Sequence, residues 1–384
     1  MTLPDFNALS DEAFRAKVRE FLAMHYPQDM RYALRRSRLA ETRDWYQTLS
    51  KQGWIAPNWP REYGGMGLDP GKMIVLLEEQ ERYGVSRLPD HGIVQVGPII
   101  MKYGTDAQKN YYLPKILTGE HIWAQGYSEP NAGSDLASLK TSAIPDGDDF
   151  IVNGQKIWTT LAHDATHLYV LVRTSTEGKR QEGISFILVD AKTPGITIRP
   201  IRNIAGHEEF CEVFFENVRV PQANLVGGLN KGWTVAKALL SFERINIGSP
   251  RRPQYALQKL GELARAKGLF ADPGFVDKYT ALELDLADLG SLYARYVEVV
   301  KRGGVLGQEV SMLKVWSMEA WQRLTDLLVE TAQEYGAMPG AHDIDGVDVD
   351  VLSPFYYARP GTIYGGSSEI QRNILAKYVL KLPA

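Results

Sequence analysis

Two polar segments, far apart in the chain, have residue types that can hold a charged or heterocyclic ligand. The first runs from Gln125 to Asp135 and includes Ser128, Gly133 and Ser134. Its hydroxyls and backbone N–H groups offer many hydrogen-bond donors in a short span, and glycine lets a ligand approach the backbone closely. The carbonyl groups and ring nitrogens of a flavin ring need such donors. The residue types alone fit a flavin site or a plain connecting loop.

The second segment, Gly365 to Glu369, lies just before a helical stretch that runs from Ile370 to Leu380. Ser367 or Ser368 suits the N-cap of that helix. Free backbone N–H groups at a helix start also suit an anion such as the pyrophosphate of a dinucleotide. The two roles are compatible, so the segment is a candidate for both.

A third candidate is a single acid, Glu243, in the segment from Ser241 to Arg244. The helix that carries it is predicted to begin near Gly232 and to end before Pro250. A glutamate in such a helix is usually solvated and paired with a nearby cation. A glutamate shut away from water would instead have a raised pKa and could act as a proton acceptor. The residue types alone leave both interpretations open.

The elements that must position these residues change in type twice along the chain. Up to about Leu117 the pattern is helical. Phe14, Val18 and Leu22 share one face of a first helix, and residues 73–83 are predicted to form another. The stretch 54–68 between them is rich in Gly, Pro and Trp and is predicted to be a loop.

Short β-rich runs replace the helices from about Ile122 to Val220. They lie at residues 150–152, 168–172, 184–189, 196–198 and 213–215, and turn clusters separate them. No helical pattern intervenes. The sequence therefore predicts an antiparallel barrel or sandwich rather than a parallel nucleotide-binding sheet.

Long helical patterns return from Gly232 onward. Leu282, Leu286 and Leu289 keep one face of a first long helix, and residues 308–335 form a second. Long amphipathic helices joined by short breaks predict an antiparallel bundle. The expected fold is α+β with three domains: an N-terminal helical domain at residues 1–120, a middle β domain at 121–231 and a C-terminal four-helix-bundle domain at 232–384.

The composition argues against several classes of protein. The formal net charge of the 384-residue chain is −3, too small to recruit nucleic acid or an acidic membrane surface. No apolar run approaches the roughly 20 residues that a membrane span needs, and the N-terminus lacks a signal-peptide pattern. The single cysteine, Cys211, is predicted to be a buried strand residue. The acidic stretch 343–350 fits a solvated loop better than a calcium site, and no Cys/His spacing suggests another metal. We expect a cytoplasmic protein with no metal.

The segments Gly126–Asp135 and Ile363–Arg372 together resemble the acyl-CoA dehydrogenase family, and the resemblance covers almost the whole chain. The Glu-Pro-x-Ala-Gly-Ser-Asp core of the first segment is specific to that family. The order helical, β, helical is also similar to the family's fold. By this resemblance, a flavin and a thioester lie between the middle β domain and the C-terminal bundle.

The resemblance also implies roles for individual residues. Trp158 is expected to pack on the flavin and Thr160 to donate to its N5 atom, although a strand tryptophan more often belongs to a core. The residues expected to bind FAD are Gln125, Tyr127, Ser128, Gly133, Ser134, Trp158, Thr160, Gln333, Gly336, Ser367 and Glu369. The residues expected to bind substrate are Ser134, which would bridge towards CoA, and Ser241, Arg244, Gly365 and Gly366.

The base of this family has an unusual placement here. Most members have a glutamate base where this chain has Gly365, which carries no proton acceptor. Glu243 occupies the position of the base in enzymes similar to isovaleryl-CoA and long-chain acyl-CoA dehydrogenases. The pair of observations favours Glu243 as the base. Gly366 is expected to polarise the thioester carbonyl through its backbone N–H, together with a ribityl hydroxyl of the flavin.

Two elements that complete the flavin site across a subunit interface in this family are altered. Ala337 and Pro339 interrupt the Gln-x-x-Gly-Gly-x-Gly pattern, and Lys267 replaces the arginine of an Arg-x-x-Phe pair. The chain is similar in this respect to the large subunits of bacterial heteromeric acyl-CoA dehydrogenases, such as those that act on pimeloyl-CoA or steroid side chains. A homotetramer or a heterotetramer with a related subunit is expected.

The reaction implied is FAD-dependent α,β-dehydrogenation of an acyl-CoA to a trans-2-enoyl-CoA. Glu243 would take the Cα proton, flavin N5 the hydride from Cβ, and an electron-transfer flavoprotein the electrons. An acyl-CoA oxidase, or a flavoenzyme similar to nitroalkane oxidase, is a first alternative. A non-catalytic subunit that completes a partner's flavin site is a second, which the presence of Glu243 argues against. The acyl group stays open.

Overall fold

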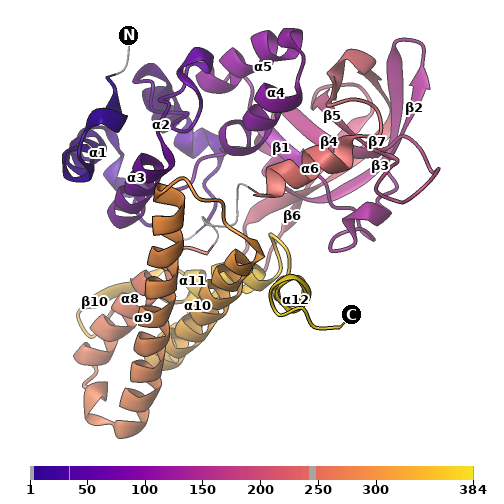
Figure 1. The fold of residues 1–384 in the computed structure, drawn as a ribbon. Helices are drawn as coiled ribbons and strands as arrows, with labels where there is room; N and C mark the ends of the chain where they lie inside the picture. The colour runs from indigo at the N-terminus through magenta and orange to yellow at the C-terminus, as the bar shows by residue number, and fades with distance from the viewer. Residues whose placement is uncertain (1–3, 34, 242–247, 384) are drawn as a thin grey trace. The chain divides into compact units, whose positions relative to one another are not determined.

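The computed structural model describes residues 4–33, 35–241 and 248–383, which form two compact units. The first unit is Met1–Phe242 and the second is Glu243–Ala384. Each unit is described by itself (Figure 1). The division after Phe242 does not test the three predicted domains, so their boundaries stay predictions.

Helices fill the first part of the first unit. The helix α1 begins where Ser10 accepts a hydrogen bond from Ala13 N, and Phe14, Val18 and Leu22 are buried on one face, which confirms the predicted pattern. The helices are α1 (Asp11–His25), α2 (Leu39–Lys51), α3 (Pro70–Tyr83), α4 (Gly97–Tyr103) and α5 (Asp106–Thr118).

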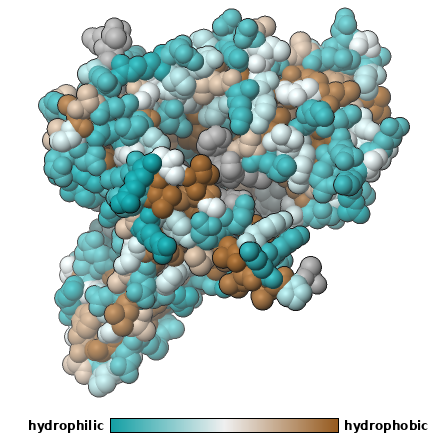
Figure 2. Space-filling view, viewed as in Figure 1, coloured by the Kyte–Doolittle hydropathy of each residue, from teal (hydrophilic) through white to brown (hydrophobic). Residues whose placement is uncertain are grey.

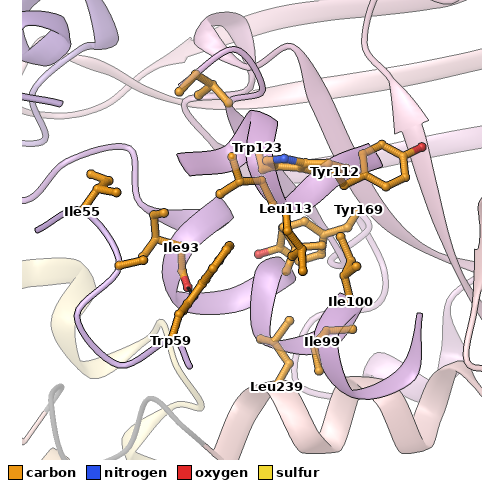
Figure 3. Packing of buried hydrophobic residues seen from close by; sticks show 14 of the residues in the cluster. Ile55, Trp59, Ile93, Ile99, Ile100, Tyr112, Leu113, Trp123, Tyr169 and Leu239 are labelled. Carbon is orange, nitrogen blue, oxygen red and sulfur yellow. Dashed lines mark hydrogen bonds between the residues drawn. The ribbon is translucent and has the colours of Figure 1, made fainter. Parts of the chain in front are cut away.

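One aromatic core joins these helices to the sheet and to α6 (Gly232–Ser241). Figure 3 shows Trp59 beside Ile93, with Tyr169 and Leu239 reaching the same cluster from a strand and from α6. The indole Nε1 of the fully buried Trp59 donates to Ile93 O over 2.7 Å. This packing requires glycine at Gly97, because a Cβ there would lie 2.1 Å from the Trp59 ring.

The sheet of the first unit has the strand order β6-β7-β3-β2-β4-β5-β8, with β1 paired to β4. Most pairs are antiparallel, as expected, but the sheet is mixed. β1 runs parallel to β4 along four residue pairs, and β2 also runs parallel to β4 at Ser142 and Arg173. A long connection separates β1 from β4, so no hairpin dictates their relative direction. The strands are β1 (Trp123–Gly126), β2 (Ser142–Asp146), β3 (Asp149–Thr160), β4 (His167–Arg173), β5 (Ile184–Asp190), β6 (Ile196–Arg202), β7 (Glu208–Pro221) and β8 (Leu225–Val226).

The second unit is built around one long helix. The helix α10 contacts the other large helices of the unit, and Leu260, Leu289, Leu313 and Leu324 lie in their shared core. The elements are α8 (Arg251–Ala266), α9 (Pro273–Lys301), α10 (Ser311–Ala332), β9 (Ala341–Ile344), β10 (Val347–Asp350), α11 (Leu352–Ala358) and α12 (Ser368–Ile374).

The acidic stretch forms a hairpin rather than an irregular loop. Asp345 and Gly346 have φ of 53° and 83°, the backbone of a two-residue hairpin turn, and β9 pairs with β10 on either side. Ile344 and Val349 point into the core of the unit. The sequence signal for this hairpin is the Asp345-Gly346 pair, which is flanked by alternating Ile and Val.

The prediction for the single cysteine is confirmed. Cys211 is fully buried in β7, as predicted. No group of three or more potential metal ligands occurs in the described ranges. No helix among them is long and apolar enough to cross a membrane.

Candidate functional site

A buried glutamate, Glu129, closes a turn within the donor-rich segment and joins the segment to the residues before β2. Glu129 and Ala132 exchange two backbone hydrogen bonds of 3.0 Å, which closes a tight turn. The Glu129 carboxylate accepts from Lys140 N at 2.6 Å and from Thr141 N at 2.8 Å. The segment is therefore a fixed loop, and its polar groups keep one arrangement.

Lys156 joins this loop to β3. Its ammonium nitrogen lies 2.7 Å from Glu129 Oε1 and 3.2 Å from Tyr127 O, and Ile157 N donates to Ser128 O over 2.9 Å. Burial lowers the pKa of the fully enclosed Lys156 to about 8, although Glu129 opposes that shift. Burial raises the pKa of Glu129, but Lys156 and the N–H donors hold it below its usual range. The two side chains thus form a buried ion pair.

A bulge in β3 turns Trp158 outward. Lys156 pairs with Val213 and Thr159 with Cys211, so β3 has one residue more than β7 in this interval. Trp158 adopts a φ of 59°, unusual for a bulky residue, and 57% of its surface is exposed. The core-packing interpretation of Trp158 is therefore wrong, and an exposed indole is available to a ligand. The predicted Thr160 follows it, half-buried, at the end of the strand.

Two further features fit a ring with carbonyl groups. Gln125 Nε2 is a buried donor with no partner among the described residues, and a ligand carbonyl could satisfy it. A Cβ on Gly133 would meet no atom within 4 Å, so the chain's own packing does not require glycine there. Both features lie in the segment that the sequence assigned to flavin binding.

A basic pocket of about 300 Å³ lies beside this segment. Arg173 shapes it by donating to Ala137 O and Leu139 O, while Lys179 and Arg180 come from the turn between β4 and β5. Arg180 also pairs with Asp135, over 3.2 Å. The pocket is lined by Ala137, Ser138, Leu139, Lys140, Arg173, Thr176, Gly178, Lys179 and Arg180. This pocket was not predicted from the sequence, where its signal was the adjacent pair Lys179 and Arg180 in a turn.

In the second unit, the predicted glycine turn precedes a capped helix. Gly365 and Gly366 have φ of 65° and 84°, a left-handed backbone that favours glycine. Ser367 caps α12 by accepting from Ile370 N over 3.4 Å, as expected. Glu369 is exposed in the first turn. The N-cap role of Ser367 is confirmed.

Two buried side chains hold the carbonyl groups of this turn. Gln371 Nε2 donates to Gly365 O over 3.1 Å, and Lys314 Nζ donates to Gly366 O over 2.7 Å. Burial lowers the pKa of Lys314 to about 8. Neither residue was predicted from the sequence, because neither belongs to a motif that indicates such a contact.

The other predicted residues of the second unit lie at the end of α10. Gln333 is exposed, with a φ of 55°. Gly336 is buried, and a Cβ there would lie 2.7 Å from Val329 O, so packing alone accounts for this glycine. Lys267 pairs with Asp345 of the hairpin over 3.1 Å, and so makes an ion pair within its own chain.

The predicted base lies outside the described residues. This holds for Glu243 and Arg244, whereas Ser241 is described only as the last residue of α6. The remaining site residues fall into two sets: Gln125 to Ser134 with Trp158 and Thr160 in the first unit, and Gln333, Gly336 and residues 365–369 in the second. In the second unit the predicted residues are not brought together: Gly366 contacts Lys314 near the start of α10, whereas Gln333 and Gly336 follow its end.

Comparison with known proteins gives one result along the whole chain. Models of the acyl-CoA dehydrogenase N-terminal, middle and C-terminal domains match residues 10–120, 124–218 and 230–380. Acyl-CoA dehydrogenase IpdE1 of Mycobacterium tuberculosis is 37% identical over 97% of this chain and 98% of its own length.

Solved structures agree with this match. The structure titled Tcur3481-Tcur3483 steroid ACAD is similar with a TM-score of 0.87 and 29% identity, and all of both chains is covered. The ChsE4-ChsE5 complex from Mycobacterium tuberculosis is similar with a TM-score of 0.79 and 30% identity, over 97% of this chain and 98% of that one.

Proposed function

The chain belongs to the acyl-CoA dehydrogenase family, and from this premise we propose that it dehydrogenates an acyl-CoA between Cα and Cβ with Glu243 as the base. FAD-dependent dehydrogenation of an acyl-CoA is the activity expected of the family. The observation that carries the proposal is the match to IpdE1 along 97% of the chain. The placement of the base rests on the pair Gly365 and Glu243.

Different residues would polarise the substrate, take its proton and bind the flavin. The Gly366 N–H would polarise the thioester carbonyl and so acidify Cα, while Glu243 takes the Cα proton. Gln125, Ser128 and Trp158 would hold the flavin ring, and their support is the orphaned amide of Gln125 and the exposed indole. Bound FAD would supply the hydride acceptor, its N5 atom.

The remaining predicted contacts belong to the same proposal. Thr160 would donate to the flavin, and Ser241 and Arg244 would lie against the substrate. An electron-transfer flavoprotein is proposed as the electron acceptor, and a cytoplasmic location is kept as a prediction.

Anaerobic titration with a panel of acyl-CoAs tests this function. We expect the visible absorbance of the flavin to bleach with at least one acyl-CoA. A correctly folded protein that neither contains nor takes up FAD would contradict the proposal. Peroxide formation in air, with poor transfer to an external acceptor, would identify the oxidase alternative instead.

The basic pocket is proposed to bind the phosphate groups of CoA. Its cations are Lys140, Arg173, Lys179 and Arg180. Arg180 pairs with Asp135, the chain neighbour of Ser134, which the family resemblance directs towards CoA. Phosphate groups attract such clusters through charge-assisted hydrogen bonds. The pocket would therefore bind the nucleotide end of acyl-CoA, and other residues would bind the acyl end.

The variant Lys179→Gln/Arg180→Gln is expected to raise the KM for acyl-CoA by about tenfold, with kcat unchanged, because only binding loses charge. The increase should disappear with the corresponding acyl-pantetheine, which lacks the nucleotide. Lys192→Gln, an exposed lysine outside the pocket, serves as the control. An equal change in KM for both substrates would contradict the assignment.

The assembly is proposed to contain a second, related chain. The solved structures named above are titled as two-component proteins. Lys267 is engaged with Asp345 in its own chain, which supports a changed interface at that position. Figure 2 shows apolar residues beside the C-terminal segment, where Ile363, Leu380 and Leu382 are each more than half exposed.

Mass measurement distinguishes the two tetramers that the sequence allows. We expect the chain to form a heterotetramer when it is co-expressed with a related acyl-CoA dehydrogenase chain from the same genome. FAD content should rise with the partner if the partner completes the site. A homotetramer that holds a full complement of FAD on its own would contradict this proposal, and an active monomer would contradict both tetramers.

A further inference from the structure

Two histidines are stacked where α5, β1 and β4 meet. The ring centroids of His121 and His167 lie 3.8 Å apart, with an angle of 29° between the ring planes. His121 is 6% exposed and His167 is 9% exposed. The rings of Tyr112 and Trp123, whose centroids are 5.5 Å apart, pack against the two histidines (Figure 3). The proposed function uses neither histidine.

The stacked pair lies where β1 begins to pair with β4. Ile122 N donates to Thr166 Oγ1 over 3.0 Å, and Ile122 O accepts from His167 N over 3.0 Å. Thr166 Oγ1 in turn lies 2.9 Å from His167 Nδ1. Trp123 is opposite His167 in the parallel register, and β1 then continues to Gly126, inside the donor-rich segment. A change at the pair therefore acts on the segment that is proposed to hold the flavin.

The surroundings keep both imidazoles neutral. Burial lowers the pKa of His167 to about 4, and the neighbouring His121 acts in the same direction. Burial also lowers the pKa of His121, and Lys115 adds to this effect. His121 Nδ1 is buried and has no hydrogen-bond partner within the described ranges, so no acceptor there stabilises a proton.

Two acids near the pair oppose these shifts only in part. Glu120 and Asp190 each act to raise the pKa of both histidines. Glu120 is itself paired with Lys115 over 2.9 Å, and Asp190 is exposed at the end of β5, where its Oδ1 accepts from Lys192 N. The rings that face the pair from α5 and β1 are those of Tyr111, Tyr112 and Trp123. The pair therefore takes up protons less readily than exposed histidines do.

We propose that the His121–His167 pair is an acid-sensitive contact between β1 and β4: proton uptake separates the two rings, opens the start of β1 and loosens the donor-rich segment. Two positive imidazoles 3.8 Å apart in an enclosed site repel each other strongly. Opening the junction lets water solvate both charges. The opening is independent of the proposed function, and only its effect on FAD rests on that function.

The direction of the pH effect follows from the protons bound in each state. In the open junction the histidines have their ordinary pKa of 6.5, whereas in the closed junction His167 stays neutral down to about pH 4. The open state therefore binds more protons between these two pH values, and acid favours opening. Each proton taken up only on opening raises the opening equilibrium constant by up to about tenfold per pH unit, so two protons give up to about a hundredfold.

Hydrogen exchange of the β1 backbone in the FAD-bound protein measures this opening. We expect the protection of residues 122–126, corrected for the intrinsic pH dependence of exchange, to fall on the order of tenfold or more between about pH 7 and about pH 5.5. FAD should dissociate faster over the same range. The variant His121→Phe/His167→Phe keeps two rings and removes both proton acceptors, so its protection should change by less than about threefold. His342→Phe, the same substitution in β9 of the second unit, should keep the wild-type pH dependence.

A second measurement needs no variant and so does not depend on how the double variant folds. Exchange of the ring C2 hydrogens, followed by mass spectrometry, gives the pKa of each histidine in the folded wild-type protein. We expect about 4 for His167 and a value below the ordinary one for His121. Ordinary pKa values for both rings would contradict the proposal, as would a double variant whose protection falls with acid as in the wild type. If protection falls as expected in a protein that takes up no FAD, the acid-sensitive contact is confirmed and the proposed function is wrong.

Discussion

The Glu243→Gln variant is expected to keep FAD and to bind acyl-CoA, but to reduce its flavin at least about a hundredfold more slowly than the wild type. A positioned general base contributes roughly this factor, and glutamine preserves the shape of the side chain without its proton acceptor. Stopped-flow measurement of flavin reduction under anaerobic conditions gives the rate directly. Equilibrium titration gives the affinity, which should change little.

Two comparisons sharpen this result. Glu283→Gln alters an exposed glutamate of α9 and should leave the rate unchanged. Adding Gly365→Glu to Glu243→Gln should restore only part of the activity. Gly365 has a φ of 65°, and a side chain in that backbone costs about 1–3 kcal/mol. If Glu243→Gln reduces its flavin at the wild-type rate with the true substrate, Glu243 is not the base.

The Lys156→Met variant is expected to lose about 3–5 kcal/mol in the free energy of unfolding, because it leaves the Glu129 carboxylate buried without its cation. The loop from Tyr127 to Thr141 should loosen as well, since Lys156 also holds Tyr127 O. Urea unfolding of the FAD-free protein measures the stability, and FAD titration measures the second effect as a weaker affinity.

A second variant, in which Glu129 is also neutralised, distinguishes the effect of the buried charge on stability from the effect of packing. The double variant Lys156→Met/Glu129→Gln should recover part of the lost stability, because no buried charge remains and the amide oxygen still accepts from a backbone N–H. Lys192→Met, on an exposed lysine, should change the stability by less than about 0.5 kcal/mol. An unfolding free energy of Lys156→Met equal to that of Lys192→Met would show that the buried pair has no net effect.

The large elements were predictable because their signals are local. The spacing of Phe14, Val18 and Leu22 confirms that periodicity alone can place a helix and its buried face. The β-rich runs of the middle part likewise correspond to β3 to β7. The parallel pairing of β1 with β4 was not predictable in this way. It depends on partners 44 positions apart in the sequence, such as Trp123 and His167, and no local pattern encodes such a pairing.

The candidate site shows the same difference between local patterns and long-range contacts. Residues in motifs typical of the family, such as Ser128 and Gly366, were predicted from the resemblance, and their roles stay predictions. The residues that hold those motifs in place were not found, and Lys314 is an example. It contacts Gly366 across 52 positions, and its type and its place on an amphipathic helix are equally typical of a solvated lysine. Only the fold reveals that its ammonium is enclosed.

The extra residue in β3 also sets the phase of the strand. Before it, the inward side chains are even-numbered, as at Phe150 and Lys156, and after it they are odd-numbered, as at Thr159. A one-residue deletion between Lys156 and Thr159 would therefore do more than remove a side chain. It would return the end of the strand to the earlier phase, moving one set of residues from solvent to core and the other from core to solvent. Natural variation in length should be absent from this short interval.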